Sequence, residues 1–148
     1  MVEQIYPYVQ IVHLICAIIF LGYIFFDVVI FMRLKGTLSV DFERVKKAIG
    51  SRAIKIMPVC LFTLIITGGM MMSRWVGSAN GGYFGTPLQK IFMLKVALAL
   101  IIAVCVAINL SCRAMGRPTP EFLRANIHKI AFVFGFIIVL CAKLMFII

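Results

Sequence analysis

Four long apolar runs, joined by three short connectors, constrain this chain more than any other feature. They cover about residues 6–32, 54–73, 87–111 and 120–148. About 20 apolar residues suffice for a helix to cross the ~30 Å hydrocarbon core of a bilayer. Of the 148 residues 64% are hydrophobic, and a soluble domain of this length could not bury so much apolar surface. We therefore predict an all-α integral membrane four-helix bundle, a single transmembrane domain over 1–148 whose outer face contacts the lipid bilayer.

The positive charges predict an orientation. Eleven Lys and Arg residues lie in or beside the first and third connectors, against two beside the second. The eleven are Arg33, Lys35, Arg44, Lys46, Lys47, Arg52, Lys55, Arg113, Arg117, Arg124 and Lys129, and the two are Arg74 and Lys90. Because cytoplasmic loops carry the excess of Lys and Arg, we predict a multi-pass protein of the inner (cytoplasmic) membrane, with two basic cytoplasmic loops and both N- and C-termini outside, in the periplasm. Topology accounts for the net charge of +10, so no nucleic acid partner is expected.

Local patterns mark the ends of some helices. Residues 86–89 read Thr-Pro-Leu-Gln, which predicts a capping box at a helix N-terminus. Residues 119–121 repeat the Thr-Pro start and place an acid in the first turn. Ser39 is expected to cap a helical part of the first connector. The glycine-rich residues 77–85 lack the Gly-Lys-Ser/Thr of a phosphate loop and are expected to form a flexible connector.

Four polar residues within the apolar runs are candidates for a functional site: His13, Asp27, Lys95 and Asn109. Ionisable residues inside a membrane are costly and usually functional. His13 and Asp27 are fourteen positions apart in the first apolar run, and Lys95 and Asn109 are fourteen apart in the third. At about 100° per residue, the two members of each pair lie within about 40° of the same helix face. We therefore predict a polar interior, with His13 and Lys95 in an outer layer and Asp27 and Asn109 in an inner one. The alternative is that Lys95 snorkels outwards and Asp27 pairs with a loop arginine.

Sulfur side chains are expected near the depth of His13. Cys16 shares its helix face, and Met70 and Met71 end the second apolar run. Imidazole and soft sulfur ligands suit haem iron or Cu(I), whereas the structural alternative is ordinary apolar packing. His128 is expected at the opposite depth, so the two histidines of one chain should not share an iron. His13 with Met70 or Met71, or two His13 residues across a homodimer, remain open.

The apolar runs also carry a family resemblance. Val12-His13-Leu14, followed by Gly22, resembles the opening helix of the HemJ and CopD families. Residues 54–58 with the later glycine pair are similar to the second helix of HemJ, and residues 94–98, around Lys95, to the third helix of both families. HemJ is a haem-associated protoporphyrinogen oxidase, and CopD is a membrane protein of copper resistance and uptake.

The resemblance implies a function and a set of site residues. It implies a haem-b-associated membrane redox protein that acts on a tetrapyrrole with quinone as the electron acceptor. Whether the chain is an enzyme stays open. His13 would be an axial metal ligand or proton acceptor, and Lys95 would neutralise a haem propionate or an anionic porphyrin. The residues assigned to the cofactor site are His13, Lys95, Asp27, Asn109, Met70 and Met71.

Two other functions stay open at this point. One is a CopD-like copper transport or homeostasis protein, in which copper replaces haem and is held by His13, Cys16 and the methionines. The other is a structural or assembly subunit of a larger membrane complex. Bound haem would favour the haem-associated redox protein, and stable co-purification with a partner would favour the structural or assembly subunit.

Overall fold

The computed structural model describes residues 2–148, and these form helices joined by short turns. Three helical stretches are long and apolar enough to cross a membrane: Glu3–Trp75, Pro87–Ala114 and Glu121–Leu144. Many large apolar side chains on them are exposed, as expected for helices that contact lipid. The predicted all-helical class is therefore confirmed, with three stretches that fit a membrane-spanning role by length and composition.

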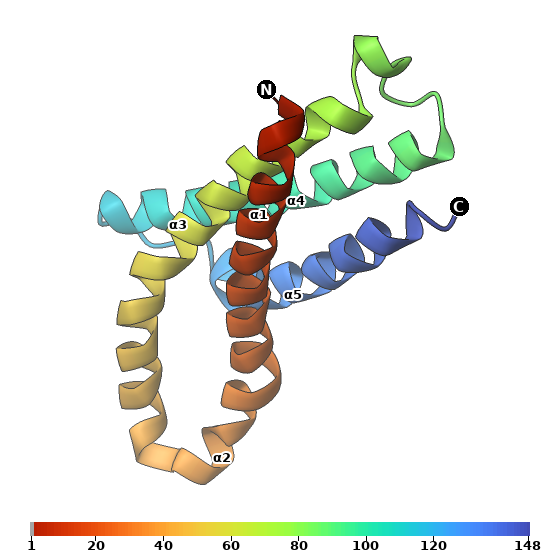
Figure 1. Cartoon of the computed structure of the whole chain (residues 1–148). Helices are drawn as coiled ribbons and strands as arrows, with labels where there is room; N and C mark the ends of the chain where they lie inside the picture. Colours follow the sequence, from red (N-terminus) through yellow and green to blue (C-terminus); the bar gives the residue numbers. More distant parts are fainter. Residues whose placement is uncertain (1) are drawn as a thin grey trace. The chain divides into compact units, whose positions relative to one another are not determined.

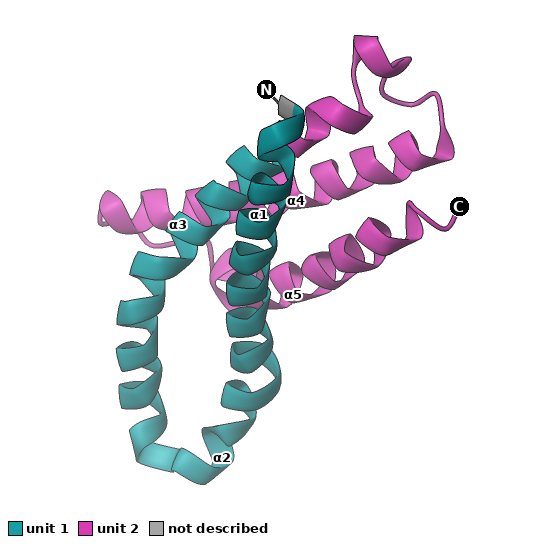
Figure 2. Ribbon diagram, in the orientation of Figure 1, with its two compact units in different colours: residues 1–68 teal, residues 69–148 magenta. Residues whose placement is uncertain are grey.

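Two compact units divide the chain, Met1–Gly68 and Gly69–Ile148 (Figure 2). In the first unit, α1 (Val2–Phe25) and α3 (Phe42–Trp75), which continues into the second unit, run in opposite directions (Figure 1). The 73-residue stretch is thus not straight but reverses within the first unit.

The reversal is built from short helical turns. They are a π-helical turn Phe26–Ile30, a 3₁₀ turn Phe31–Leu34, α2 (Lys35–Leu38) and a 3₁₀ turn Ser39–Asp41. The rings of Phe31 and Phe42 stack with their centroids 5.0 Å apart, and both residues are buried. This aromatic pair closes the bend between α1 and α3.

The start of α3 differs from the sequence-based expectation. Ser39 does not cap a helix with its side chain; it has a φ of +44° and ends α2. A residue in this left-handed region turns the chain out of one helix and towards the next. α3 then begins at Phe42 instead of near residue 54. The intervening segment is polar but rich in Lys, Arg, Glu and Ala, which favour helix, so α3 continues beyond its apolar part.

The second unit contains α4 (Pro87–Ala114) and α5 (Glu121–Leu144), which pack against each other. α4 begins with the predicted capping box. The Thr86 hydroxyl accepts from the Gln89 backbone N–H at 3.2 Å, and the Gln89 side chain accepts from the Thr86 N–H at 3.2 Å. At α5 the N-cap position is Pro120, with no side-chain cap. The helix expected to reach residue 148 ends at Leu144.

Gln89 also organises the connector before α4, which contains a 3₁₀ turn (Ser78–Asn80). It is 4% exposed, and its side-chain oxygen accepts a second bond from the Gly85 N–H at 2.9 Å. Its side-chain nitrogen donates to the Asn80 carbonyl at 2.8 Å. The connector expected to be flexible is therefore hydrogen-bonded to the first turn of α4. In the same unit, Val76, Phe92 and Met145 form a buried apolar cluster.

Replacing Gln89 by Ala should lower the stability of the second unit. The change removes one cap and several bonds to connector backbone groups, and we expect a loss of about 1–3 kcal/mol in the free energy of unfolding. Unfolding of the detergent-solubilised protein, followed by circular dichroism, measures the loss. Lys90→Ala is the matched control, because Lys90 is the exposed neighbour. Equal stability of the two variants would contradict this role of Gln89.

Candidate functional site

His13 forms a side-chain hydrogen bond between α1 and α3 in the first unit. Its Nδ1 lies 2.7 Å from the hydroxyl oxygen of Thr67. His13 is half-buried, and Thr67 is 7% exposed. The Thr67 hydroxyl also lies 2.7 Å from the backbone carbonyl of Thr63, one turn earlier on α3. The three residues form a chain that runs from the imidazole into the backbone of the facing helix.

The hydrogen-bond chain favours one tautomer of the His13 ring. A threonine hydroxyl has a single hydrogen, and that hydrogen is donated to the Thr63 carbonyl, which can only accept. With its hydrogen on that carbonyl, the Thr67 oxygen accepts from His13, an arrangement that places the ring hydrogen on Nδ1. In a neutral imidazole the lone pair then belongs to Nε2. Metal-ligating histidines are held in this way, with one ring N–H donated to an oxygen of the surrounding protein.

Gly68 gives the imidazole its space. A Cβ built on Gly68 would lie 3.4 Å from Cε1 and 4.0 Å from Nδ1 of His13. The nearer distance is already at the limit of van der Waals contact, so a side chain longer than a methyl group would push the ring away. Thr67 thus orients the His13 ring through a hydrogen bond, and Gly68, which has no side chain, leaves space for the ring.

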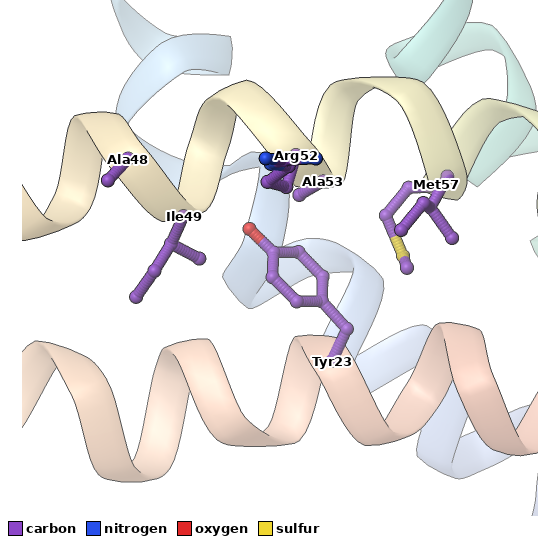
Figure 3. A pocket seen from close by; sticks show the side chains of 7 residues that line it. Tyr23, Ala48, Ile49, Arg52, Ala53 and Met57 are labelled. Atoms are coloured by element: carbon purple, nitrogen blue, oxygen red, sulfur yellow. The ribbon is translucent and has the colours of Figure 1, made fainter.

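Asp27 lies further along α1, in the π-helical turn. It is 6% exposed and interacts electrostatically with Tyr23, one turn earlier. Tyr23 in turn reaches from α1 towards Arg52 on α3, across a pocket between the two helices (Figure 3). The remaining lining residues are Ala48, Ile49, Ala53, Ile56 and Met57. This end of the first unit therefore combines an apolar lining with the polar groups of Tyr23 and Arg52.

Lys95 and Asn109 lie in the second unit, on α4, and each has its own local partner. The Lys95 ammonium lies over the Phe92 ring, 5.1 Å from its centroid, so it is directed towards the N-terminal end of α4. That is the direction expected for a snorkelling lysine. The Asn109 side-chain oxygen accepts from the Thr119 hydroxyl at 3.1 Å, which ties the end of α4 to the connector before α5. Thr119, which the sequence pattern placed at the start of α5, bonds to Asn109 and does not cap α5.

The remaining candidates are the two methionines and the second histidine. Met70 is exposed and Met71 half-buried; both follow Thr67 on α3 and belong to the second unit. His128 lies half-buried on α5. Within residues 2–148, no three His, Cys, Asp or Glu side chains converge as ligands for a metal ion.

Sequence reasoning did not select Thr67 or Gly68 as site residues. A signal was present, because Thr63 and Thr67 are four residues apart on an otherwise apolar helix and therefore share a face. The pairing of that face with His13 depends on the register of α1 against α3, which the sequence does not state. Tyr23 and Arg52 were missed for the same reason.

The comparisons with known proteins give no family for this chain. No protein-family model, no curated protein and no solved structure matches it.

Replacing Thr67 by Val tests the bond that orients His13. The change keeps the shape of the side chain and removes the oxygen, and we expect a loss of about 1–3 kcal/mol in the free energy of unfolding. Thr63→Val is the matched control, because the Thr63 hydroxyl bonds to the Val59 carbonyl and its own carbonyl remains in place. The nitrogen-15 spectrum of His13 should show a protonated Nδ1 in the wild type and in Thr63→Val. The assignment fails if the wild type carries its proton on Nε2.

Proposed function

We propose that this chain is a haem-b-associated redox protein of the inner membrane, with His13 as an axial ligand. The observation that carries the proposal is the chain from His13 through Thr67 to the Thr63 carbonyl, with both distances at 2.7 Å. It leaves the Nε2 lone pair as the coordinating group of the ring. A histidine held by its Nδ1–H is the usual axial ligand of haem proteins.

A haem fits the number of ligands that the first unit offers. The porphyrin supplies four nitrogens to iron, so the protein needs to add only one or two axial groups. The half-buried imidazole of His13, on an apolar helix pair, would supply one such axial group. When bound, haem supplies one-electron transfer. His13 would hold it, Thr67 would fix the ring orientation, and Gly68 would leave the ring its space.

The other assignments remain predictions from the sequence. Lys95 is proposed for a propionate or an anionic porphyrin, and Asp27, Asn109, Met70 and Met71 for the surroundings of the cofactor. A tetrapyrrole substrate, quinone as acceptor and homodimerisation rest on the family resemblance and on general chemistry.

We further propose four membrane crossings with both termini outside. Each arm of the reversed 73-residue stretch is long enough for one crossing: α1 has 24 residues and α3 has 34, and each residue adds 1.5 Å. With α4 and α5 this makes four crossings. The excess of Lys and Arg in the first and third connectors favours the cytoplasm for both.

Absorption spectroscopy of the purified protein tests the haem assignment. The oxidised wild type should show a Soret band, and reduction should sharpen the bands at longer wavelength. His13→Ala should lose most of the bound haem because the axial bond is gone. His128→Ala is the control and should keep the wild-type spectrum. A colourless wild type from haem-replete cells, or a spectrum that depends on His128, would refute the proposal.

Labelling of introduced cysteines tests the orientation. A membrane-impermeant maleimide should label Ala79→Cys in intact cells, because this exposed residue lies in the second connector. Lys47→Cys, exposed on the basic segment of α3, should react only after the cells are opened. The opposite pattern would invert the topology, and labelling of both in intact cells would remove one crossing.

A further inference from the structure

The pocket between α1 and α3 in the first unit joins an apolar lining to a positive charge. Its volume is about 500 Å³. Tyr23 and Arg52 bring polar groups to it, and the Tyr23 ring points from α1 towards α3 beside Arg52 (Figure 3). Ala48 and Ile56, which also line it, are exposed. The pocket is therefore open to whatever surrounds the helix pair.

Arg52 lies at the depth of lipid headgroups when α3 crosses a membrane. Between Lys55 and Arg74, the 18 residues 56–73 of α3 carry no charged side chain. At 1.5 Å per residue they span ~27 Å, close to the ~30 Å hydrocarbon core of a bilayer. Arg52 precedes residue 56 by four positions, or ~6 Å along the helix. Because the headgroup region on each side of the core is ~5–8 Å thick, Arg52 reaches the level of the lipid phosphates.

The charges beside the pocket favour an anion. Arg52 is exposed, and within residues 2–148 no side chain forms a hydrogen bond or an ion pair with its guanidinium. A guanidinium can donate two parallel hydrogen bonds to a phosphate group. Lys55, three residues later and exposed, adds a second cation within about 60° of the same helix face. Asp27, the nearby acid of α1, is buried and does not line the pocket.

The lining continues from Arg52 towards the hydrocarbon core. Ala53, Ile56 and Met57 follow it along α3, in the direction of the charge-free residues 56–73. An acyl chain that starts at the headgroup level therefore meets apolar side chains as it enters the membrane. A soluble phosphate ester would meet the cations but would leave this lining uncovered.

We propose that the pocket binds one anionic phospholipid. Arg52 holds the phosphate at the headgroup level, and Ala53, Ile56 and Met57 contact the first part of an acyl chain. Basic pockets between transmembrane helices bind anionic headgroups in this way. The site requires that α1 and α3 cross the membrane, as proposed above, but it does not require that His13 binds haem.

Native mass spectrometry of the full chain in detergent tests the site. The probe is phosphatidylglycerol, and phosphatidylcholine with the same acyl chains is the zwitterionic comparison. The wild type should bind one phosphatidylglycerol per chain more tightly than phosphatidylcholine. Arg52→Gln should weaken the binding of phosphatidylglycerol at least about 5-fold, because one cation near the headgroups is lost. Arg52→Lys keeps the charge and should retain part of the affinity.

Lys47→Gln is the matched control for the charge. It removes one exposed cation from the same helix, about 140° away from Arg52, and Lys47 does not line the pocket. This variant should bind phosphatidylglycerol as the wild type does. Equal losses in Lys47→Gln and Arg52→Gln would show attraction to the whole basic segment and would overturn the proposal. Equal affinity of the wild type for the two lipids would overturn it as well.

Ala53→Leu tests the apolar part of the site. The larger side chain fills part of the pocket and leaves Arg52 in place, and each methylene group kept out of the pocket should weaken binding about 4-fold. Unchanged affinity in Ala53→Leu, or displacement of the lipid by glycerol 3-phosphate, would reduce the site to a soluble-phosphate site and refute the proposal. A colourless protein that still selects phosphatidylglycerol would refute the haem assignment alone. Loss of this selectivity with the haem spectrum intact would refute the lipid site alone.

Discussion

The hydrocarbon core of a bilayer offers no hydrogen-bond partners, and this constraint governs the whole structure. Helices satisfy their own backbone groups, which is why the apolar runs form helices. A polar side chain on such a helix must then bond to its own backbone or to a neighbour. Thr67 does both: its hydrogen returns to the Thr63 carbonyl and its oxygen takes the His13 N–H. Among residues 2–148, no buried side-chain nitrogen or oxygen lacks a partner.

The same constraint gives His13 its proposed chemistry. A hydroxyl that has already donated its hydrogen to a carbonyl can only accept, so the facing imidazole is held as one tautomer. The helix pair thus orients a single nitrogen of the ring through a hydroxyl. For an axial ligand this matters twice, because the bond fixes the direction of the ring and makes the imidazole a stronger donor.

Composition and local patterns predicted the helical class, the apolar segments and the capping box at residues 86–89. These features depend on residues that are close together in the sequence, so they can be predicted from it. The bend at residues 31–41 was not predicted in detail, because the stacking of Phe31 on Phe42 and the left-handed Ser39 depend on how α1 meets α3. The partners of His13 and Asn109 were missed for the same physical reason: Thr67 and Thr119 are ordinary threonines until packing brings them to those side chains.

The central claim is that Thr67 holds His13 as an axial ligand of haem iron. A redox titration of the haem absorbance in the wild type, Thr67→Val and Thr63→Val tests it most directly. On this claim the Nδ1–H bond would strengthen the ligand and stabilise ferric iron, so Thr67→Val should keep haem but have a higher midpoint potential, while Thr63→Val should match the wild type. Equal potentials in all three proteins, or the absence of a haem signal in the wild type, would contradict the claim.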